Sequence, residues 1–154
     1  MIKFGHLLGR PFWWGINDCR TLAADFYKDN FDIEFPTFDL PTDWDNGKAG
    51  VVVKELLDRG FEVVDYNPYK TYAADLYVSA FFSPFPNHIS VCVGGNFIIH
   101  HVEGRLSEVV EFKGVVRSNL CATLRHPKVM LEEDKPTLVD VLDDAPYQIR
   151  RKFE

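Results

Sequence analysis

Two alternating segments joined by a pair of glycines constrain the fold of this chain more than any other feature. Residues 88–93 alternate side chains between two faces as a strand does, and residues 97–102 form a second strand-like segment after Gly94-Gly95. Glycines between two such segments are typical of a tight hairpin turn, so the two strands are predicted to pair antiparallel. His88 and Ser90 then share one face of the hairpin, and the other face is apolar and belongs to the core.

The remaining segments predict helices first and further strands afterwards. Leu22, Ala23, Phe26 and Tyr27 have helical spacing after the capping residues Asn17-Asp18, which predicts a helix from about 19 to 30. A packed loop rich in Pro, Asp, Asn and Gly is expected over 31–50, and a second helix over 51–59 that stops at Gly60. Further strands are expected over 61–64, 76–82, 109–112 and 120–126. Helices followed by an antiparallel meander predict an α+β fold.

Length and charge limit the classes of function. At 154 residues, with 46% hydrophobic residues, the chain can bury one core, and a single folded domain is expected. The net charge of -6, without a cluster of Lys and Arg, argues against nucleic acid or an anionic membrane as a partner. We expect no membrane-spanning segment and no signal peptide, and therefore synthesis and folding in a cytoplasm.

Three cysteines, Cys19, Cys92 and Cys121, fit neither a disulfide framework nor a zinc ribbon. Cys19 follows the capping residue Asp18, so its sulfur is expected in the first helical turn, where N–H groups and the helix dipole favour a thiolate. We predict that Cys19 is a catalytic nucleophile, against the ordinary interpretation of a lone cysteine as a packing residue. Cys92 and Cys121 are interpreted as packing residues.

A nucleophilic thiol needs a base, and His88 is the candidate. The hairpin brings back a second imidazole as the group that orients this base: a loop of three residues would place His100 opposite His88, and a loop of two residues would place His101 there. A metal site is the competing interpretation, but the paired ligands of structural zinc sites are missing, so no metal or other cofactor is predicted. Aromatic residues near both segments are interpreted mainly as core, with some able to line a peptide-binding cleft: Trp13, Trp14, Phe81, Phe82 and Phe85.

Three motifs together resemble the NlpC family of cell-wall cysteine peptidases: Asp18-Cys19 opening a helix, residues 74–78 before a strand, and residues 87–91 leading into 98–100. The spacing of His88 and His100 is similar to that between the family's base and its orienting residue, so the resemblance favours His100 over His101. It also implies that Asp18 helps to bind the amino end of the substrate. Arg20 and Thr21 stand where the family usually has Ser and Gly, and the family's upstream tyrosine has no evident counterpart.

The resemblance implies a papain-like, NlpC-type fold and hydrolysis of peptidoglycan stem peptides, commonly between D-glutamate and diaminopimelate. Further motifs within residues 9–126 are similar to the peptidase half of tail assembly proteins from lambda-like phages, which implies a virion tail tip and other tail-tip proteins as partners. We therefore expect a peptidase domain over 1–126 and a C-terminal extension over 127–154 that docks onto a tail protein. The alternative is a catalytically weak or inactive structural tail-tip plug or adaptor that retains the peptidase fold.

Overall fold

A six-stranded antiparallel sheet organises the computed structural model, which describes residues 2–35, 51–129, 146 and 149. The strands are β1 (Glu62–Val64), β2 (Leu76–Ser79), β3 (His88–Gly94), β4 (Phe97–His100), β5 (Glu108–Glu111) and β6 (Leu120–Arg125). Their order across the sheet is β1-β6-β2-β3-β4-β5. The predicted α+β class with an antiparallel sheet is confirmed.

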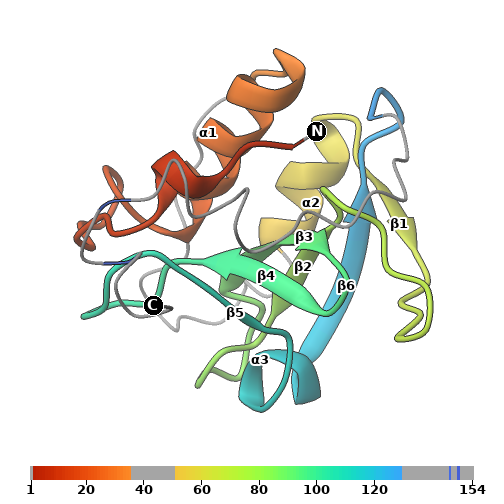
Figure 1. The fold of residues 1–154 in the computed structure, drawn as a ribbon. Helices are drawn as coiled ribbons and strands as arrows, with labels where there is room; N and C mark the ends of the chain where they lie inside the picture. The colour runs from red at the N-terminus through yellow and green to blue at the C-terminus, as the bar shows by residue number, and fades with distance from the viewer. Residues whose placement is uncertain (1, 36–50, 130–145, 147–148, 150–154) are drawn as a thin grey trace.

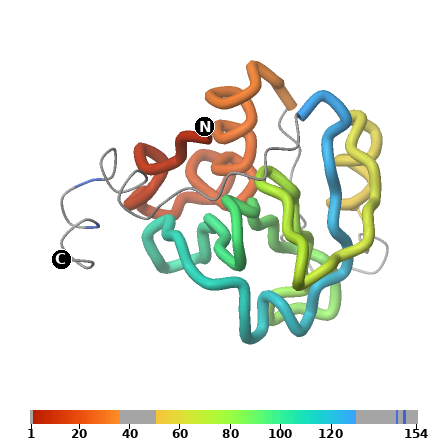
Figure 2. The backbone as a smooth tube through the Cα atoms, turned by 45° about the vertical axis from the view of Figure 1, so that its right-hand side comes forward, coloured from red at the N-terminus to blue at the C-terminus, as the bar shows by residue number. Residues whose placement is uncertain are grey.

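The predicted meander is right for β2 to β5 and wrong for the last strand. β6 pairs with β2, and β1 pairs with the other edge of β6. β1 and β6 lie side by side in Figure 2. Hydrophobic alternation predicts that a segment is a strand, but it does not select a partner distant in sequence.

Helices lie on both faces of this sheet (Figure 1). α1 (Cys19–Phe31) packs against β3 and β4, and α2 (Val51–Asp58) contributes Val52 and Leu56 to the same core. A smaller cluster on the opposite face includes Tyr77, Cys92 and Phe112, with Val116 from the short helix α3 (Val115–Ser118). A 3-10 turn, η1 (Gly5–Leu7), precedes α1.

The predicted helices have nearly the observed ends, whereas the loop predicted over 31–50 lies largely outside the described residues. Gly60 follows α2 with φ +94°, as expected for a left-handed cap. The short elements η1 and α3 were not predicted from the sequence.

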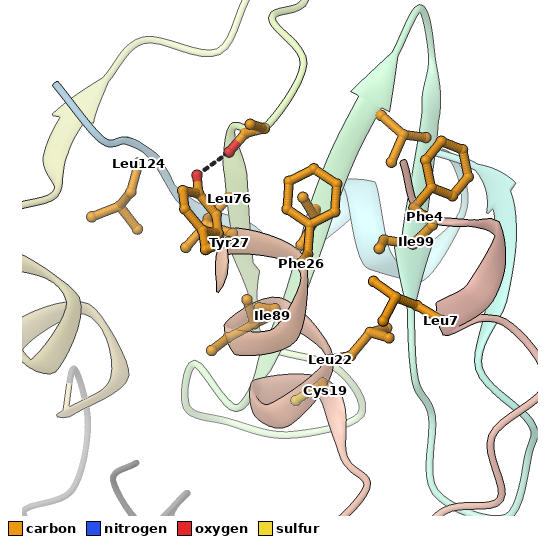
Figure 3. Packing of buried hydrophobic residues seen from close by; sticks show 14 of the residues in the cluster. Phe4, Leu7, Cys19, Leu22, Phe26, Tyr27, Leu76, Ile89, Ile99 and Leu124 are labelled. Atoms are coloured by element: carbon orange, nitrogen blue, oxygen red, sulfur yellow. Dashed lines mark hydrogen bonds between the residues drawn. The ribbon is translucent and has the colours of Figure 1, made fainter. Parts of the chain in front are cut away.

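The main core forms between α1 and the sheet (Figure 3). Leu22, Phe26 and Tyr27 from the inner face of α1 are fully buried against residues such as Ile89 and Ile99. The hydroxyl of Tyr27 donates to the carbonyl of Ala74, shown as a dashed line in Figure 3. This packing fixes the first turn of α1, and with it Cys19, against β3.

Candidate functional site

A capping box fixes the start of α1, where Cys19 is the first residue. One carboxylate oxygen of Asp18 accepts a hydrogen bond from Thr21 N–H at 2.9 Å, and the Thr21 hydroxyl accepts one from Asp18 N–H at 2.8 Å. The second carboxylate oxygen accepts from Gly15 N–H at 2.8 Å. Asp18 is 1% exposed, so its carboxylate shapes the turn that leads into α1, and its substrate-binding role stays a prediction.

The environment of Cys19 differs from the one expected at an open helix start. The side chain is only 4% exposed, and burial raises the pKa of the thiol to about 12. A hydrogen bond from Ile89 N–H lowers this pKa and the charge of Asp18 raises it, but burial dominates. The resting site therefore holds a neutral thiol, and the expected preference for a thiolate is not met in the free protein.

His88 and His100 come together across the hairpin, as predicted, but in another register. β3 and β4 pair Val91 with Ile99 and Cys92 with Ile98, and Gly94 pairs with Phe97 across an irregularity. Continued along the strands, this register leaves neither His100 nor His101 directly opposite His88; His100 is its diagonal neighbour on the same face. The Nε2 atom of His88 lies 3.1 Å from Nδ1 of His100.

His88 is a neutral imidazole at physiological pH. It is 5% exposed, and its pKa is lowered to about 3, first by burial and then by electrostatic interaction with the neighbouring rings of His100 and His101. Because Nε2 is engaged with His100, Nδ1 is the ring nitrogen that remains for a proton from a thiol. Neutral imidazole has the lone pair that a general base requires.

The hydrogen-bonded series continues beyond the residues predicted from sequence. His100 Nε2 lies 3.0 Å from Oε1 of Glu108, the first residue of β5, and Glu108 pairs with His100 in the sheet register. The other oxygen of Glu108 accepts from Arg105 Nη2 at 3.0 Å. Nothing in the periodicity of residues 108–111 indicated this contact, since it depends on which strand lies beside β4.

One cavity of about 650 Å³ contains both Cys19 and His88 in its wall. Four aromatic side chains, a single carboxylate and three further residues line it as well: Phe12, Trp14, Phe81, Phe82, Glu103, Asn87, His101 and Val102. Burial lowers the pKa values of His88 and His101, which favours their neutral forms, and Glu103 is the acidic side chain among the lining residues. The cavity is therefore mainly aromatic and has one acidic position.

The interpretation of these aromatic residues as core is wrong for Trp13, Trp14 and Phe82, whereas Phe81 packs against the smaller cluster. Trp14 is 49% exposed and Phe82 is 78% exposed, and Trp13 beside them is 63% exposed. Trp14, Phe81 and Phe82 line the cavity, which agrees with the alternative that some of them form a cleft. The sequence alone could not distinguish aromatic residues of the core from those of the cleft, because aromatic residues are common both in cores and in ligand sites.

Two segments far apart in the sequence are joined at the cavity wall. Trp14 Nε1 donates to Oε1 of Glu103 at 3.1 Å. Behind them, Ser107 is fully buried, and its hydroxyl accepts from Arg10 N–H at 2.9 Å and donates to the carbonyl of Leu7 at 2.7 Å. The segment before α1 and the connection between β4 and β5 thus form one continuous wall.

His101, which the sequence left as an alternative to His100, has a different environment. Its ring lies in the cavity wall against Phe12, with the two ring centroids 5.1 Å apart, and Nε2 donates to the carbonyl of Arg105 at 3.1 Å.

Within the described part of the chain, no three His, Cys, Asp or Glu side chains are arranged to hold a metal ion.

The other two cysteines lie away from this cavity. Cys92 is buried in the small cluster, as predicted, whereas Cys121 is exposed and the prediction of a packing role for it is wrong. β6 presents Cys121 on its exposed side, where its sulfur lies 3.4 Å from the carbonyl oxygen of Asn119.

Comparison with known proteins finds homology to two phage proteins. The chain is 31% identical over 103 residues to tail tip assembly protein K of Escherichia phage lambda, which covers 67% of this chain and 50% of that protein. It is 27% identical over 126 residues to tail tip assembly protein K of Escherichia phage N15, which covers 80% of this chain and 50% of that protein. The chain thus spans about half the length of the curated relatives it matches. No protein-family model matches it.

Proposed function

We propose, from the homology to tail tip assembly protein K, that this chain acts in a phage tail tip and carries a cysteine hydrolase site there. Cys19 is the nucleophile, His88 the base and His100 the residue that orients the base. The observation that supports the site most directly is the cavity, which contains Cys19 and His88 while His88 is hydrogen-bonded to His100. A nucleophile, a base and an orienting group in this order are the parts of a catalytic triad.

The proposed fold is papain-like, of the NlpC type, over residues 1–126. The features that support it are a cysteine at the first position of a helix, an antiparallel sheet against which that helix packs, and a histidine at the start of the central strand β3. In this architecture the thiol and the imidazole come from separate layers, and the substrate binds where the layers meet.

The neutral state of both groups determines the mechanism that we propose. Cys19 gives its proton to Nδ1 of His88 as Sγ attacks a peptide carbonyl, so proton transfer accompanies attack. Backbone N–H groups at the start of α1 stabilise the oxyanion, and the His88 imidazolium then protonates the departing amine. Water, activated by the neutral His88, hydrolyses the thioester and restores the thiol.

The proposed substrate is the stem peptide of peptidoglycan, which a tail tip meets at the bacterial cell wall. The aromatic wall of the cavity provides apolar area for a peptide, and Glu103 provides a negative charge for an ammonium group. Stem peptides carry such groups at an amino end or on diaminopimelate. A neutral glycan alone would make no use of this charge.

Purified chain incubated with defined muropeptides tests the activity, with products separated by chromatography and identified by mass. We expect cleavage by the wild type and by Cys121→Ser, and loss of cleavage in Cys19→Ala and His88→Ala. Cys121→Ser is the matched control, because it removes an exposed thiol far from the cavity. Absence of cleavage by the wild type, or equal cleavage by Cys19→Ala, would reject the hydrolase.

A structural tail-tip adaptor without activity is the second candidate, and the burial and raised pKa of Cys19 favour it. Complementation of a phage that lacks this protein distinguishes the two. If the site is catalytic, Cys19→Ala should be incorporated into tails while infection across an intact wall falls. If infection is unchanged, the adaptor is the correct function.

Other tail-tip proteins are the proposed partners, and residues 127–154 are the proposed docking extension. Within it, the sequence of residues 136–142 could open a short amphipathic helix, and these residues lie outside those that the structure describes. None of the described helices is both long and apolar enough to cross a membrane.

A further inference from the structure

Glu108 and Arg105 form the far end of a hydrogen-bonded series that begins at His88. The contacts run from His88 Nε2 to His100 Nδ1 at 3.1 Å, from His100 Nε2 to Glu108 Oε1 at 3.0 Å, and from Glu108 Oε2 to Arg105 Nη2 at 3.0 Å. The two imidazoles are buried, Glu108 is partly buried, and Arg105 lies at the surface. The series therefore connects the candidate base to an exposed guanidinium.

For a neutral His100, the chemistry at the Arg105 end allows one arrangement of protons. An arginine side chain only donates hydrogen bonds, and an ionised carboxylate only accepts them. Burial alone raises the pKa of Glu108, but the hydrogen bonds and charges of His100 and Arg105 outweigh it, so this pKa is lowered and Glu108 is ionised at neutral pH. His100 must then carry its proton on Nε2, facing Glu108.

The proton position on His100 determines the proton position on His88. A neutral imidazole has one N–H, so a His100 protonated on Nε2 presents a lone pair at Nδ1. That lone pair accepts from His88, which must carry its proton on Nε2 and hold its own lone pair on Nδ1. This tautomer leaves a lone pair on Nδ1, as the proposed general base requires, and the opposite tautomer would place an N–H there.

We propose that Glu108, held by Arg105, is a positioning residue that selects the Nδ1 lone-pair tautomer of His88 through His100. Its part in catalysis rests on the proposed hydrolase, whereas the tautomer selection is a property of the folded chain alone. Glu108 reaches no reacting atom; its effect passes through two imidazole rings.

Replacement of Glu108 by glutamine gives a specific prediction. Arg105 donates to this side chain in the wild type, so we expect it to hold the amide oxygen of the glutamine and to leave the amide NH₂ facing His100 Nε2. His100 then accepts at Nε2 and donates from Nδ1, and His88 accepts at Nε2 and carries its proton on Nδ1. The single change thus reverses both tautomers, while the shape of the side chain is kept.

Nitrogen NMR of the imidazole rings in the 154-residue chain near neutral pH tests the selection directly. Protonated and unprotonated ring nitrogens have well-separated shifts, so each tautomer can be assigned. We expect His88 protonated on Nε2 in the wild type and on Nδ1 in Glu108→Gln. In the double variant Arg105→Ala/Glu108→Gln the amide is free to turn, and the wild-type tautomer should recover at least in part.

The control is Glu111→Gln, the same substitution at the other end of β5, which should leave both rings unchanged. The amide spectrum of each variant reports its fold. His88 protonated on Nδ1 in the wild type would overturn the proposal without any variant, and an unchanged His88 in folded Glu108→Gln would do so as well.

Hydrolysis provides a second readout that is separate from the first. If the wild type cleaves muropeptides, Glu108→Gln should lower kcat by about 10²- to 10⁴-fold, the contribution of a general base, and the double variant should recover part of it. Reversed tautomers with an inactive wild type would sustain the positioning role and reject only the hydrolase. Full activity with reversed tautomers would reject the catalytic part of the proposal.

Discussion

At Cys19, the position in the helix and the degree of burial act on the thiol in opposite directions. The first turn of a helix favours a thiolate, but removal from water opposes any charge there. Burial is the larger effect, and it raises the pKa from 9.0 to about 12. The sequence correctly indicated the helix position, but burial depends on Ile89 and the rest of the core, which the local sequence does not specify.

Alkylation of the Cys121→Ser variant measures this pKa. Thiolate is the reactive form, and below a pKa of about 12 its fraction rises about tenfold for each pH unit. We expect labelling of Cys19 to be slow at neutral pH and to continue rising through the alkaline range, as followed by peptide mass spectrometry. A plateau near the ordinary pKa of a thiol would contradict the effect of burial. In the wild type, the exposed Cys121 should react first.

Glu103 allows a prediction about substrate choice. In Glu103→Gln the amide can still accept from Trp14 Nε1, so the wall is kept while the charge is lost. Because this side chain is exposed, the KM for a muropeptide with a free amino end should rise by only about two- to fivefold. The same peptide with an acetylated amino end is the control, and its KM should not change. An equal rise for both peptides would mean that Glu103 does not bind the ammonium group.

At the scale of elements, Arg20 and Thr21, the two residues that differ from the pattern expected from the NlpC resemblance, have a local structural role. Thr21 occupies the third position of α1, where its hydroxyl completes the capping box with Asp18, and Arg20 donates to the carbonyl of Gly15 at 3.5 Å. A glycine at position 21 could not supply this hydroxyl. Thr21 therefore stabilises the start of the helix that presents Cys19.

Replacement of Thr21 by valine keeps the shape of the side chain and removes the hydroxyl that bonds to Asp18 N–H. The free energy of unfolding should fall by about 1 kcal/mol, a typical value for the loss of a cap. Urea denaturation followed by circular dichroism provides the measurement. Thr21→Ser is the matched control, because it keeps the hydroxyl. Equal losses in both variants would assign the effect to packing and not to the cap.

The strands show where sequence information ends. Alternation in residues 88–93 and 97–102 was sufficient to predict the hairpin and the proximity of its histidines. It could not give the register, because the irregularity between Cys92 and Gly94 shifts the pairing beyond what loop length alone predicts. Nor could it give Glu108, whose contact with His100 depends on β5 lying at the edge of β4.

At the scale of the whole molecule, part of the predicted extension contributes to the main core. Val129 is 7% exposed and Ile149 is 5% exposed, and both belong to the cluster that contains α1. Gly9, which precedes the cavity wall, has φ +83°, and a Cβ there would lie 3.3 Å from Pro146 and 3.4 Å from Ile149. Pro146 and Ile149 therefore pack against the N-terminal part of the chain, and Val129 belongs to the main core.

These contacts lead to a test of the boundary predicted at residue 126. Ile149→Ala should lower the free energy of unfolding by about 2 to 5 kcal/mol, because it removes a buried side chain and leaves a cavity beside Gly9. Ile16→Ala is the matched control: the same substitution at a side chain that is 71% exposed should cost less than about 0.5 kcal/mol. Both free energies are measured by urea denaturation.

If the two variants lose the same small amount of stability, residues 127–154 serve only for docking, and a fragment ending at 126 should fold and retain any muropeptide cleavage. If Ile149→Ala alone is destabilising, such a fragment lacks part of its core, and docking to a tail partner must be tested with exposed substitutions and not by truncation.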